Sequence, residues 1–397
     1  MMRFDKTILQ IIPRLDGGGA ERMVVEISGA IVRAGGRALV ASAGGRLAQD
    51  VERVGGAFLK APVQSKNPAT LVANISLLKR LIAAHNVDIV HVHSRAPAWS
   101  ALFAARGAGV PLVTSYHGAY RARGPLKRWY NSSMARGDCV IANSRFIADI
   151  VRAEHGVGED RIRVIPPGAD LSVFDPKKVS PARVAKLVGS WRLPDDGSSA
   201  PRDFRILFPG RPTRLKGHAV AIDAVAQFAA RLGTGHDLEL TLVFCGGAQG
   251  RNRYADEMRA KVEEYGVSDM VHWVGECADM PAAYDWADLV LAPSTRPEGF
   301  GRVAVEAGAM CRPVVASAHG GALETVIDGE NGYLATPGDA RALSDAIEKV
   351  WRLGETGRRT MGEKARARAR SLYSAETMCD ATLMAYTGAA SKKGGKI

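Results

Sequence analysis

The first half of the chain alternates short apolar runs, rich in β-branched residues, with longer stretches whose apolar residues recur at helical spacing. One such helical face consists of Met23, Ile27, Ala30, Ile31 and Ala34. Alternation of this kind is typical of parallel strands joined by helices. The expected strands are Thr7–Ile12, Ala38–Ser42, Asp88–Val92, Leu112–Ser115, Cys139–Ala142 and Arg163–Ile165. We therefore predict an α/β, doubly wound domain of five or six strands over residues 1–172.

A second series of the same kind begins after a stretch, 193–203, that is rich in Pro, Ser, Gly and Asp. Turn residues of this sort, together with the Pro166-Pro167-Gly168 run, mark the expected joint, and we assign 173–203 to a linker. The expected strands of the second domain, 204–372, are Arg205–Phe208, Glu239–Phe244, Val271–Val274, Leu289–Ala292, Val314–Ala316 and Tyr333–Ala335. A last amphipathic helix is expected over 373–390, followed by a disordered tail, 391–397.

Charge and cysteine content narrow the class of protein. The net charge of +12 is uneven, because residues 1–172 carry a net +10 and the remainder +2. A basic first half favours an anionic partner, and anionic lipid or a phosphorylated glycan fits as well as nucleic acid. We expect no nucleic acid, because zinc-finger, RNP-type and basic-zipper signatures are absent from the sequence. The five cysteines are scattered without zinc-ligand spacing, and no apolar run approaches the roughly 20 residues of a membrane helix. We expect a cytoplasmic protein with free thiols.

The strongest chemical signal lies at 297–306, which reads PEGFGRVAVE. It follows the expected strand Leu289–Ala292 and leads into a helical stretch, so its glycines occupy a strand-to-helix turn. Backbone N–H groups at such a turn, with the helix dipole, favour an anion. Glu298 in the turn can accept hydrogen bonds from sugar hydroxyls, and Glu306 on the helix can reach a ribose diol. The alternative is that both glutamates are solvated charges.

The second signal is 210–217, which reads GRPTRLKG and again joins a strand to a helix. Arg211 and Lys216 are expected at the same edge of the sheet as Glu298. Two fixed cations there would stabilise the negative charge that develops on a leaving diphosphate. Taken alone, the loop would be better interpreted as a solvated basic turn, and the glutamates favour the diphosphate.

Together these motifs resemble the retaining family 4 glycosyltransferases of the GT-B fold. The resemblance runs nearly end to end, because further segments follow in the same order: 15–22, 88–93, 114–118, 142–144 and 165–170. It implies two Rossmann-like domains facing across a cleft, with the C-terminal helix returning to the N-terminal domain. It also implies transfer of a sugar with retention of configuration, from a UDP-, GDP- or ADP-linked donor in the second domain to an acceptor in the first.

The resemblance also implies individual roles. Arg211 and Lys216 match the family's diphosphate cations, Glu298 the group on the donor sugar, and Glu306 the group on the ribose. The amides of Gly299, Phe300 and Gly301 match the loop around the sugar. The loop that faces donor phosphate and acceptor is matched by Gly17, Gly18 and Gly19. The main chain of Val274 matches the contact with the nucleobase. His117 matches a histidine near the donor sugar. These assignments make His117, Glu298, Arg211 and Lys216 the expected catalytic residues.

No metal or other cofactor is expected, since Arg and Lys supply the positive charge and no Asp-x-Asp motif follows a strand. His91 and His93 are interpreted as residues that pack in the core or line the wall of the site, because a third metal ligand is missing. Alternatives within the scaffold are a sugar-nucleotide epimerase and a soluble disaccharide synthase. Outside it are a Rossmann dehydrogenase, which lacks its glycine fingerprint here, and a basic nucleic-acid-binding module.

The segment 120–130 interleaves Arg121, Arg123, Lys127 and Arg128 with Leu126, Trp129 and Tyr130. Cations beside interfacial aromatic residues suit peripheral contact with an anionic membrane, although an ordinary solvated helix fits as well. We expect a glycan or lipid-linked acceptor at this domain and a role in lipopolysaccharide or other cell-envelope glycan synthesis.

Overall fold

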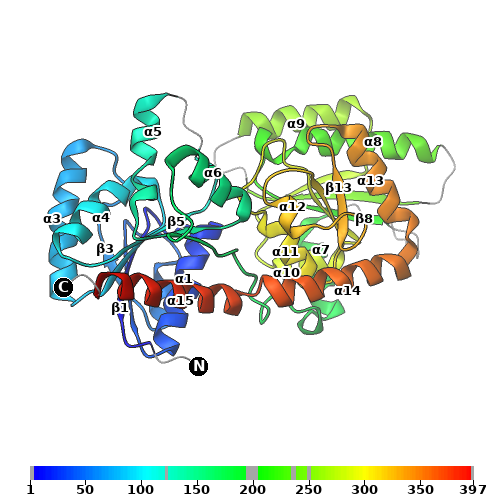
Figure 1. The fold of residues 1–397 in the computed structure, drawn as a ribbon. Helices are drawn as coiled ribbons and strands as arrows, with labels where there is room; N and C mark the ends of the chain where they lie inside the picture. Colours follow the sequence, from blue (N-terminus) through cyan, green and yellow to red (C-terminus); the bar gives the residue numbers. More distant parts are fainter. Residues whose placement is uncertain (1–3, 121–123, 194–203, 234–237, 248–251, 395–397) are drawn as a thin grey trace. The chain divides into compact units, whose positions relative to one another are not determined.

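The computed structural model describes residues 4–120, 124–193, 204–233, 238–247 and 252–394. It divides the chain into two compact units. The first unit combines residues 1–167 with 375–397, and the second contains Gly168–Ser374. Each unit is a parallel sheet covered by helices on both faces (Figure 1).

The first unit has a seven-stranded parallel sheet in the order β3-β2-β1-β4-β5-β6-β7. Its strands are β1 (Thr7–Ile11), β2 (Arg37–Ser42), β3 (Ala57–Lys60), β4 (Ile89–Val92), β5 (Leu112–Tyr116), β6 (Cys139–Ala142) and β7 (Ile162–Val164). Strand β3 is absent from the strands expected from sequence, and it is an edge strand in which no residue is fully buried. An edge strand of this kind lacks the apolar run that identifies a central one.

Helices cover both faces of this sheet. They are α1 (Gly19–Arg33), α2 (Ala48–Arg53), α3 (Pro68–Ala84), α4 (Arg95–Gly107), α5 (Pro125–Asn131), the 3₁₀ turn η1 (Met134–Arg136), α6 (Arg145–His155) and α15 (Ala375–Gly394). One core cluster joins α3, α4 and α6 to one face of the sheet, and another joins α1 and α15 to the opposite face. The C-terminal helix α15 thus packs beside α1 near the other end of the chain (Figure 1). It continues to Gly394, into the stretch expected to be a disordered tail.

The second unit has a six-stranded parallel sheet in the order β10-β9-β8-β11-β12-β13. Its strands are β8 (Phe204–Pro209), β9 (Leu240–Cys245), β10 (Val271–Gly275), β11 (Leu289–Ala292), β12 (Val314–Ser317) and β13 (Gly332–Ala335). All six overlap the expected strands. In both sheets the strand order reverses beside the first strand, which creates a switch point where α/β proteins bind ligands at the carboxyl edge. These switch points lie between β1 and β4 and between β8 and β11.

The helices of the second unit are η2 (Pro176–Lys178), α7 (Pro181–Trp191), η3 (Arg214–Lys216), α8 (His218–Leu232), α9 (Asn252–Glu264), α10 (Met280–Trp286), α11 (Arg302–Ala309), α12 (Ala322–Thr325), α13 (Ala340–Arg352) and α14 (Gly354–Leu372). Helix α7 lies inside the stretch expected to be a linker. Its apolar residues pack on the face of the sheet that α10 covers, and Arg183 pairs with Asp279 at 2.7 Å. The residues from Gly168 to Leu193 that the structure describes therefore belong to the second unit.

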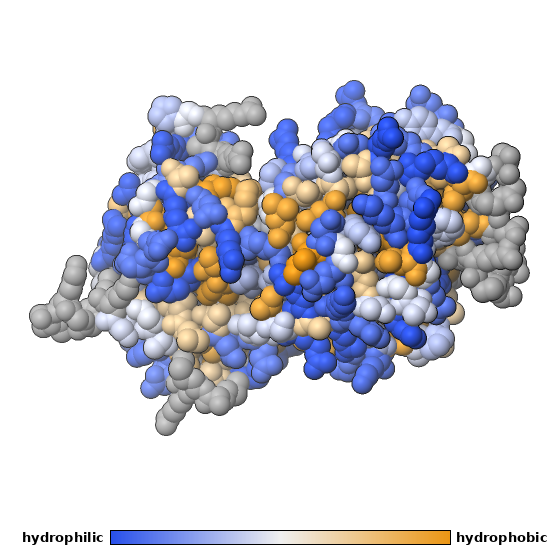
Figure 2. All heavy atoms as spheres, turned by 45° about the vertical axis from the view of Figure 1, so that its right-hand side comes forward, coloured by the Kyte–Doolittle hydropathy of each residue, from blue (hydrophilic) through white to orange (hydrophobic). Residues whose placement is uncertain are grey.

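No helix within the described ranges is both long and apolar enough to cross a bilayer. On the face drawn in Figure 2, hydrophobic residues form small groups between hydrophilic ones.

Candidate functional site

Lys216 and Glu298 meet at the switch point of the second unit. Lys216 ends the 3₁₀ turn after β8, and Glu298 lies in the loop between β11 and α11. The Lys216 Nζ donates to Glu298 Oε1 at 2.8 Å and to Oε2 at 3.0 Å. The two signals, 82 residues apart in the chain, thus form one contact.

Glycines allow the two loops to approach so closely. Gly217 has a φ of +84°, and a Cβ there would lie 2.0 Å from the Pro293 carbonyl oxygen. Gly320 and Gly321 pass over the Glu298 loop, where the Gly321 N–H donates to the Glu298 carbonyl at 3.0 Å. Any side chain at these positions would push the loops apart.

Glu298 is held in its ionised form. Burial alone would raise the pKa of its carboxyl group, but the charge of Lys216 and hydrogen bonds from Lys216 and Ser294 outweigh burial and hold the pKa below its ordinary value. The Ser294 hydroxyl donates to Glu298 Oε1, and the Ser294 carbonyl lies 2.8 Å from His319 Nε2. The carboxylate is therefore fixed as a hydrogen-bond acceptor.

A pocket opens beside this pair. Its lining includes Lys216, Ser294, Glu298, Gly301, His319 and Thr325. Apolar residues from β8, α11 and β12 complete the wall. A small concave site with a few convergent polar groups is the usual form of a ligand pocket.

The other residues assigned to the donor lie apart from this pocket lining. Arg211 is exposed, and Val274 packs partly buried at the end of β10. Phe300 is buried against Tyr373, with ring centroids 5.2 Å apart, so only its main chain could serve a ligand. Glu306 accepts from the Tyr284 hydroxyl at 3.0 Å and pairs with Arg302 at 3.2 Å.

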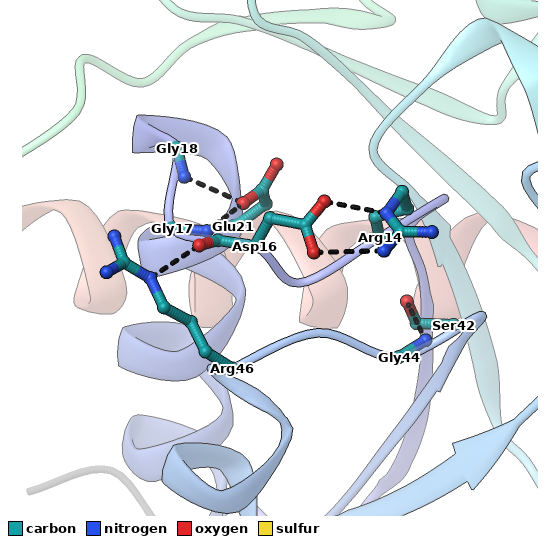
Figure 3. A network of polar contacts seen from close by, with 8 residues as sticks. All are labelled: Arg14, Asp16, Gly17, Gly18, Glu21, Ser42, Gly44 and Arg46. Carbon is teal, nitrogen blue, oxygen red and sulfur yellow. Dashed lines mark hydrogen bonds and ion pairs between the residues drawn. The ribbon is translucent and has the colours of Figure 1, made fainter. Parts of the chain in front are cut away.

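The glycine-rich loop of the first unit follows β1 and leads into α1. The N–H groups of Gly17 and Gly18 both donate to the Glu21 carboxylate, at 2.7 Å from Gly18 (Figure 3). Gly19 is the first residue of α1. A ligand that takes up the amides of Gly17 and Gly18 must therefore displace Glu21, whose carboxylate caps the helix.

Charged residues support this loop from both sides. Arg14 pairs with the Asp16 side chain at 2.6 Å, and the Arg46 guanidinium donates to the Asp16 carbonyl at 2.6 Å (Figure 3). Gly17 has a φ of +127°, and a Cβ there would meet the Arg46 side chain. The loop conformation thus depends on glycine at this position.

His117 lies at the end of β5, in the same unit. Its Nε2 is 3.2 Å from His93 Nδ1, and burial lowers the pKa of His117 to about 4. Burial also lowers the pKa of His91 to about 3. Hydrogen bonds to protein groups, rather than packing alone, fix His91 and His93. Among the described residues, no group of three or more His, Cys, Asp or Glu is arranged to hold a metal ion.

The basic segment is only partly described, because Arg121 and Arg123 lie outside the described residues. Lys127, Arg128 and Trp129 lie on the short helix α5, and Arg128 donates to the Glu154 carbonyl at 2.6 Å. Trp129 is 56% exposed and stacks on Trp99, with ring centroids 4.6 Å apart.

Several polar residues at these sites escaped the sequence analysis. Ser294 and His319 line the pocket beside Glu298. Tyr386 contacts His91, and Gln10 contacts His93. Ser294, four residues before Glu298, could have been noticed as a residue at the end of β11. Tyr386 could not, because 295 residues separate it from its partner His91.

Comparison with known proteins gives the family. The sequence model of Glycosyltransferase Family 4 matches residues 17–173, and that of Glycosyl transferases group 1 matches residues 190–368. The D-inositol 3-phosphate glycosyltransferase of Xylanimonas cellulosilytica is 33% identical over 299 residues, which cover 71% of this chain and 68% of that protein. The D-inositol 3-phosphate glycosyltransferase 1 of Catenulispora acidiphila is 32% identical over 68% of this chain and 65% of its own length. The chain thus spans about two thirds of the length of these relatives.

Solved structures agree with the sequence comparison. A glycosyltransferase from Rickettsia africae superposes with a TM-score of 0.87 at 28% identity, covering 99% of this chain and 100% of that one. HepE of Anabaena, solved in complex with UDP and glucose, superposes with a TM-score of 0.78 at 26% identity, covering 94% and 97%. The chain therefore belongs to the retaining family 4 glycosyltransferases of the GT-B fold.

Proposed function

We propose that this chain transfers a sugar from a nucleotide-sugar bound by the second unit to an anionic acceptor bound by the first. The observation that carries the donor assignment is the Lys216–Glu298 pair at the switch point between β8 and β11. A cation and a fixed carboxylate at the carboxyl edge of a parallel sheet suit a ligand with both phosphate and hydroxyl groups. The Anabaena relative's complex with UDP and glucose supports a uridine nucleotide.

Each group of the donor meets a matching group in this proposal. Lys216 and Arg211 neutralise the diphosphate, Glu298 accepts hydrogen bonds from sugar hydroxyls, and amides of residues 299–301 hold the sugar. Glu306 and the main chain of Val274 serve the nucleoside. Both oxygens of Glu298 are already held by Lys216 and one also by Ser294, which favours a binding role over attack on the sugar.

Retention then follows without a protein nucleophile. We propose a front-face transfer in which the bond between the anomeric carbon and the phosphate oxygen breaks, the acceptor oxygen bonds to that carbon from the same face, and the leaving phosphate accepts the proton of the acceptor hydroxyl. The protein's contribution is to orient both substrates and to stabilise the charge on the departing diphosphate.

The acceptor assignment rests on charge and on the relatives. Residues 1–172 carry a net charge of +10, and the curated relatives are named for D-inositol 3-phosphate. A phosphorylated polyol and the phosphorylated, lipid-linked glycan of a cell envelope share the anionic chemistry that such a surface would attract. We propose an acceptor of this class, with envelope glycan synthesis, including that of lipopolysaccharide, as its setting.

The decisive experiment compares variants of the two loops that meet at the Lys216–Glu298 pair. Lys216→Ala and Glu298→Gln are expected to lower turnover roughly 100- to 1000-fold, as typical losses of a charged contact at a reacting centre. Arg214→Ala is the matched control, because this cation is three-quarters exposed and pairs with Glu257 outside the pocket. Near-normal turnover in either site variant would remove the donor assignment.

A binding panel identifies the substrates. Thermal unfolding with UDP-, GDP- and ADP-sugars should show stabilisation by one nucleotide, by about 2.7 kcal/mol at 100 times its dissociation constant. Transfer to inositol 3-phosphate would favour the small acceptor, and transfer to a phosphorylated lipid-linked glycan would favour the envelope acceptor. Transfer only to neutral acceptors would contradict the anionic class.

A second candidate function is docking of the first unit on an anionic membrane. Exposed apolar side chains gather on α4 and α5, where Phe103 is 49% and Leu126 78% exposed. Arg136 lies over the Trp99 ring at 5.5 Å, which adds a cation beside the aromatic pair of Trp99 and Trp129. Aromatic residues beside cations are typical of surfaces that bind lipid headgroups.

Sedimentation with vesicles tests this docking. Wild type is expected to pellet with anionic vesicles and not with neutral ones, whereas a variant with Arg121, Arg123, Lys127 and Arg128 changed to Gln should remain in solution. Trp129→Ala should weaken pelleting at unchanged charge. Equal, weak pelleting of all three proteins would exclude a membrane role for this surface.

A further inference from the structure

The first unit contains a line of polar side chains on the side of the sheet that α1 and α15 cover. Gln10, His91, His93 and Ser115 are buried, and His117 at the end of the line is half-buried. They come from the ends of the adjacent strands β1, β4 and β5 and share one face, because side chains alternate along a strand. Together they form two separate hydrogen-bonded branches.

The first branch begins with Gln10, whose orientation is fixed by its partners. Its Nε2 lies 3.2 Å from the Val24 carbonyl oxygen and 2.8 Å from Ser28 Oγ. A carbonyl oxygen can only accept, and the Ser28 hydroxyl donates its own proton to the same carbonyl at 2.7 Å. The amide nitrogen must therefore face α1, which leaves Oε1 directed at His93.

This orientation decides where the proton of His93 resides. Gln10 Oε1 lies 3.0 Å from His93 Nε2 and can only accept, so His93 must carry its proton on Nε2. A neutral imidazole with a proton on Nε2 has a lone pair on Nδ1. That lone pair points to His117 Nε2 at 3.2 Å, which must in turn be the donor.

The alternative is a charged His93 that donates from both nitrogens. Burial and the neighbouring His91 and His117 rings hold the pKa of His93 well below its ordinary value. The ring centroids of His91 and His93 also lie 3.9 Å apart, so the two rings could not both be charged without repulsion. The neutral form is the one that this environment stabilises.

From this chain of contacts we propose that Gln10 and His93 are positioning residues that fix His117 as the Nε2–H tautomer. The Nδ1 atom of His117 is then a hydrogen-bond acceptor, and it has no hydrogen-bond partner among the described residues. It can accept from a hydroxyl group and cannot bind a phosphate oxygen, which has no proton to donate. The inference rests on the proposed function, since it gives His117 a sugar hydroxyl, and not the diphosphate, as its ligand.

The second branch provides a matched control. His91 Nδ1 lies 2.6 Å from the Tyr386 hydroxyl of α15, and His91 Nε2 lies 2.8 Å from Ser115 Oγ. These residues are as buried as Gln10 and His93, but no hydrogen bond joins them to His93 or His117 in the part of the chain that the structure describes. Changes here should alter stability and leave the tautomer of His117 unchanged.

The test reads the tautomers directly, by long-range ¹H–¹⁵N correlation spectra of the full chain labelled with ¹⁵N-histidine and without substrate. Both His93 and His117 are expected as Nε2–H in wild type and in Tyr386→Phe. In Gln10→Met, which removes the acceptor at similar volume, His93 and His117 should lose this single tautomer. Observation of His117 as Nδ1–H in wild type, or of an unchanged His117 in Gln10→Met, would overturn the proposal.

Turnover measurements distinguish failure of the positioning role of Gln10 and His93 from failure of the proposed function. His93→Leu removes both hydrogen bonds of this side chain and is expected to lower kcat/KM roughly tenfold, which corresponds to one hydrogen bond. His93→Gln retains one acceptor and one donor at this position, so it should keep more activity than His93→Leu. Equal losses in both variants would reduce His93 to a packing residue and contradict the proposal. Correct tautomers together with full activity of His117→Ala would leave the positioning role in place and refute a substrate contact by His117.

Discussion

The ion pair between Lys216 and Glu298 is partly buried, since about a quarter of each side chain is exposed. Pairs of this kind contribute modestly to stability, and their removal is felt chiefly where a ligand depends on them. We therefore expect variants at these positions to retain their fold, which makes their turnover interpretable.

Gly217 and Gly301 allow the effect of an added side chain on the unfolding free energy to be compared between a crowded and an open position. Both have a φ of +84°, but a Cβ at Gly217 would meet the Pro293 carbonyl at 2.0 Å, and one at Gly301 would meet nothing within 4 Å. Gly301→Ala should cost about 1–2 kcal/mol of unfolding free energy for the left-handed backbone. Gly217→Ala should cost about 1–3 kcal/mol more. Urea unfolding of both variants measures the difference, and equal losses would contradict the close approach of the two loops.

The buried histidines predict a pH dependence of stability. The pKa values of His91 and His117 are lowered from 6.5 to about 3 and about 4, so the unfolded chain binds more protons in this interval. The unfolding free energy should be constant above pH 6.5 and fall below it, by up to about 1.4 kcal/mol per pH unit for each histidine. The described side chains that hydrogen-bond to the His91 and His117 rings are those of Tyr386, Ser115 and His93, and none of them is a carboxylate.

Urea unfolding between pH 7.5 and 5 measures this dependence above the range in which carboxylates titrate. His91→Gln should make the slope shallower. A flat profile in wild type over this interval would contradict the burial of neutral histidines.

At the residue scale, the pair most directly foreseen from sequence was Lys216 with Glu298, because each follows a strand and parallel strands share a carboxyl edge. The partners of these residues were less accessible to prediction. That Glu21 would occupy the amides of Gly17 and Gly18 depends on the first turn of α1, and that Gln10 would orient two histidines depends on the register of β1 against β4. Neither contact has a signature in the order of residues alone.

At the scale of elements, the buried strands were predictable and the edges were not. Strands such as β11 are continuous apolar runs between turns, whereas β3 is a half-exposed edge whose residues read as a loop. The turn residues near helix α7 predict a linker, yet Ser180 caps this helix and its apolar residues pack on the second sheet. Packing across a surface decides such elements, and sequence spacing does not reveal it.

Helix α15 gives a prediction at this scale. Tyr386 is fully buried and its hydroxyl contacts His91, so Tyr386→Phe leaves a buried nitrogen without its partner and should cost about 1–3 kcal/mol. Met384→Ala on the same helix is the control, because this side chain is 67% exposed and its loss should stay within about 0.5 kcal/mol. Thermal unfolding compares them, and equal stability of both variants would argue against the docking of α15 on the first unit.

At the scale of the whole molecule, catalysis is expected to proceed without a divalent cation, since Arg211 and Lys216 supply the positive charge for the diphosphate. Turnover measured with excess EDTA should equal that of the untreated protein, and added manganese should not raise it. Complete loss of activity on chelation, restored by manganese, would contradict this prediction and require metal ligands from the substrate or from side chains not assigned here.

The first unit is assembled from two stretches of chain separated by the entire second unit. During synthesis on the ribosome, β1 to β7 emerge early, but the residues of α15 that complete their core follow about 220 residues later. At a synthesis rate of roughly 5–20 residues per second, the face of the sheet that α15 covers stays exposed for about 10–45 s. The second unit, which is continuous, can fold in that interval. The first unit, whose strands are synthesised first, therefore completes its core only after the whole second unit has been synthesised.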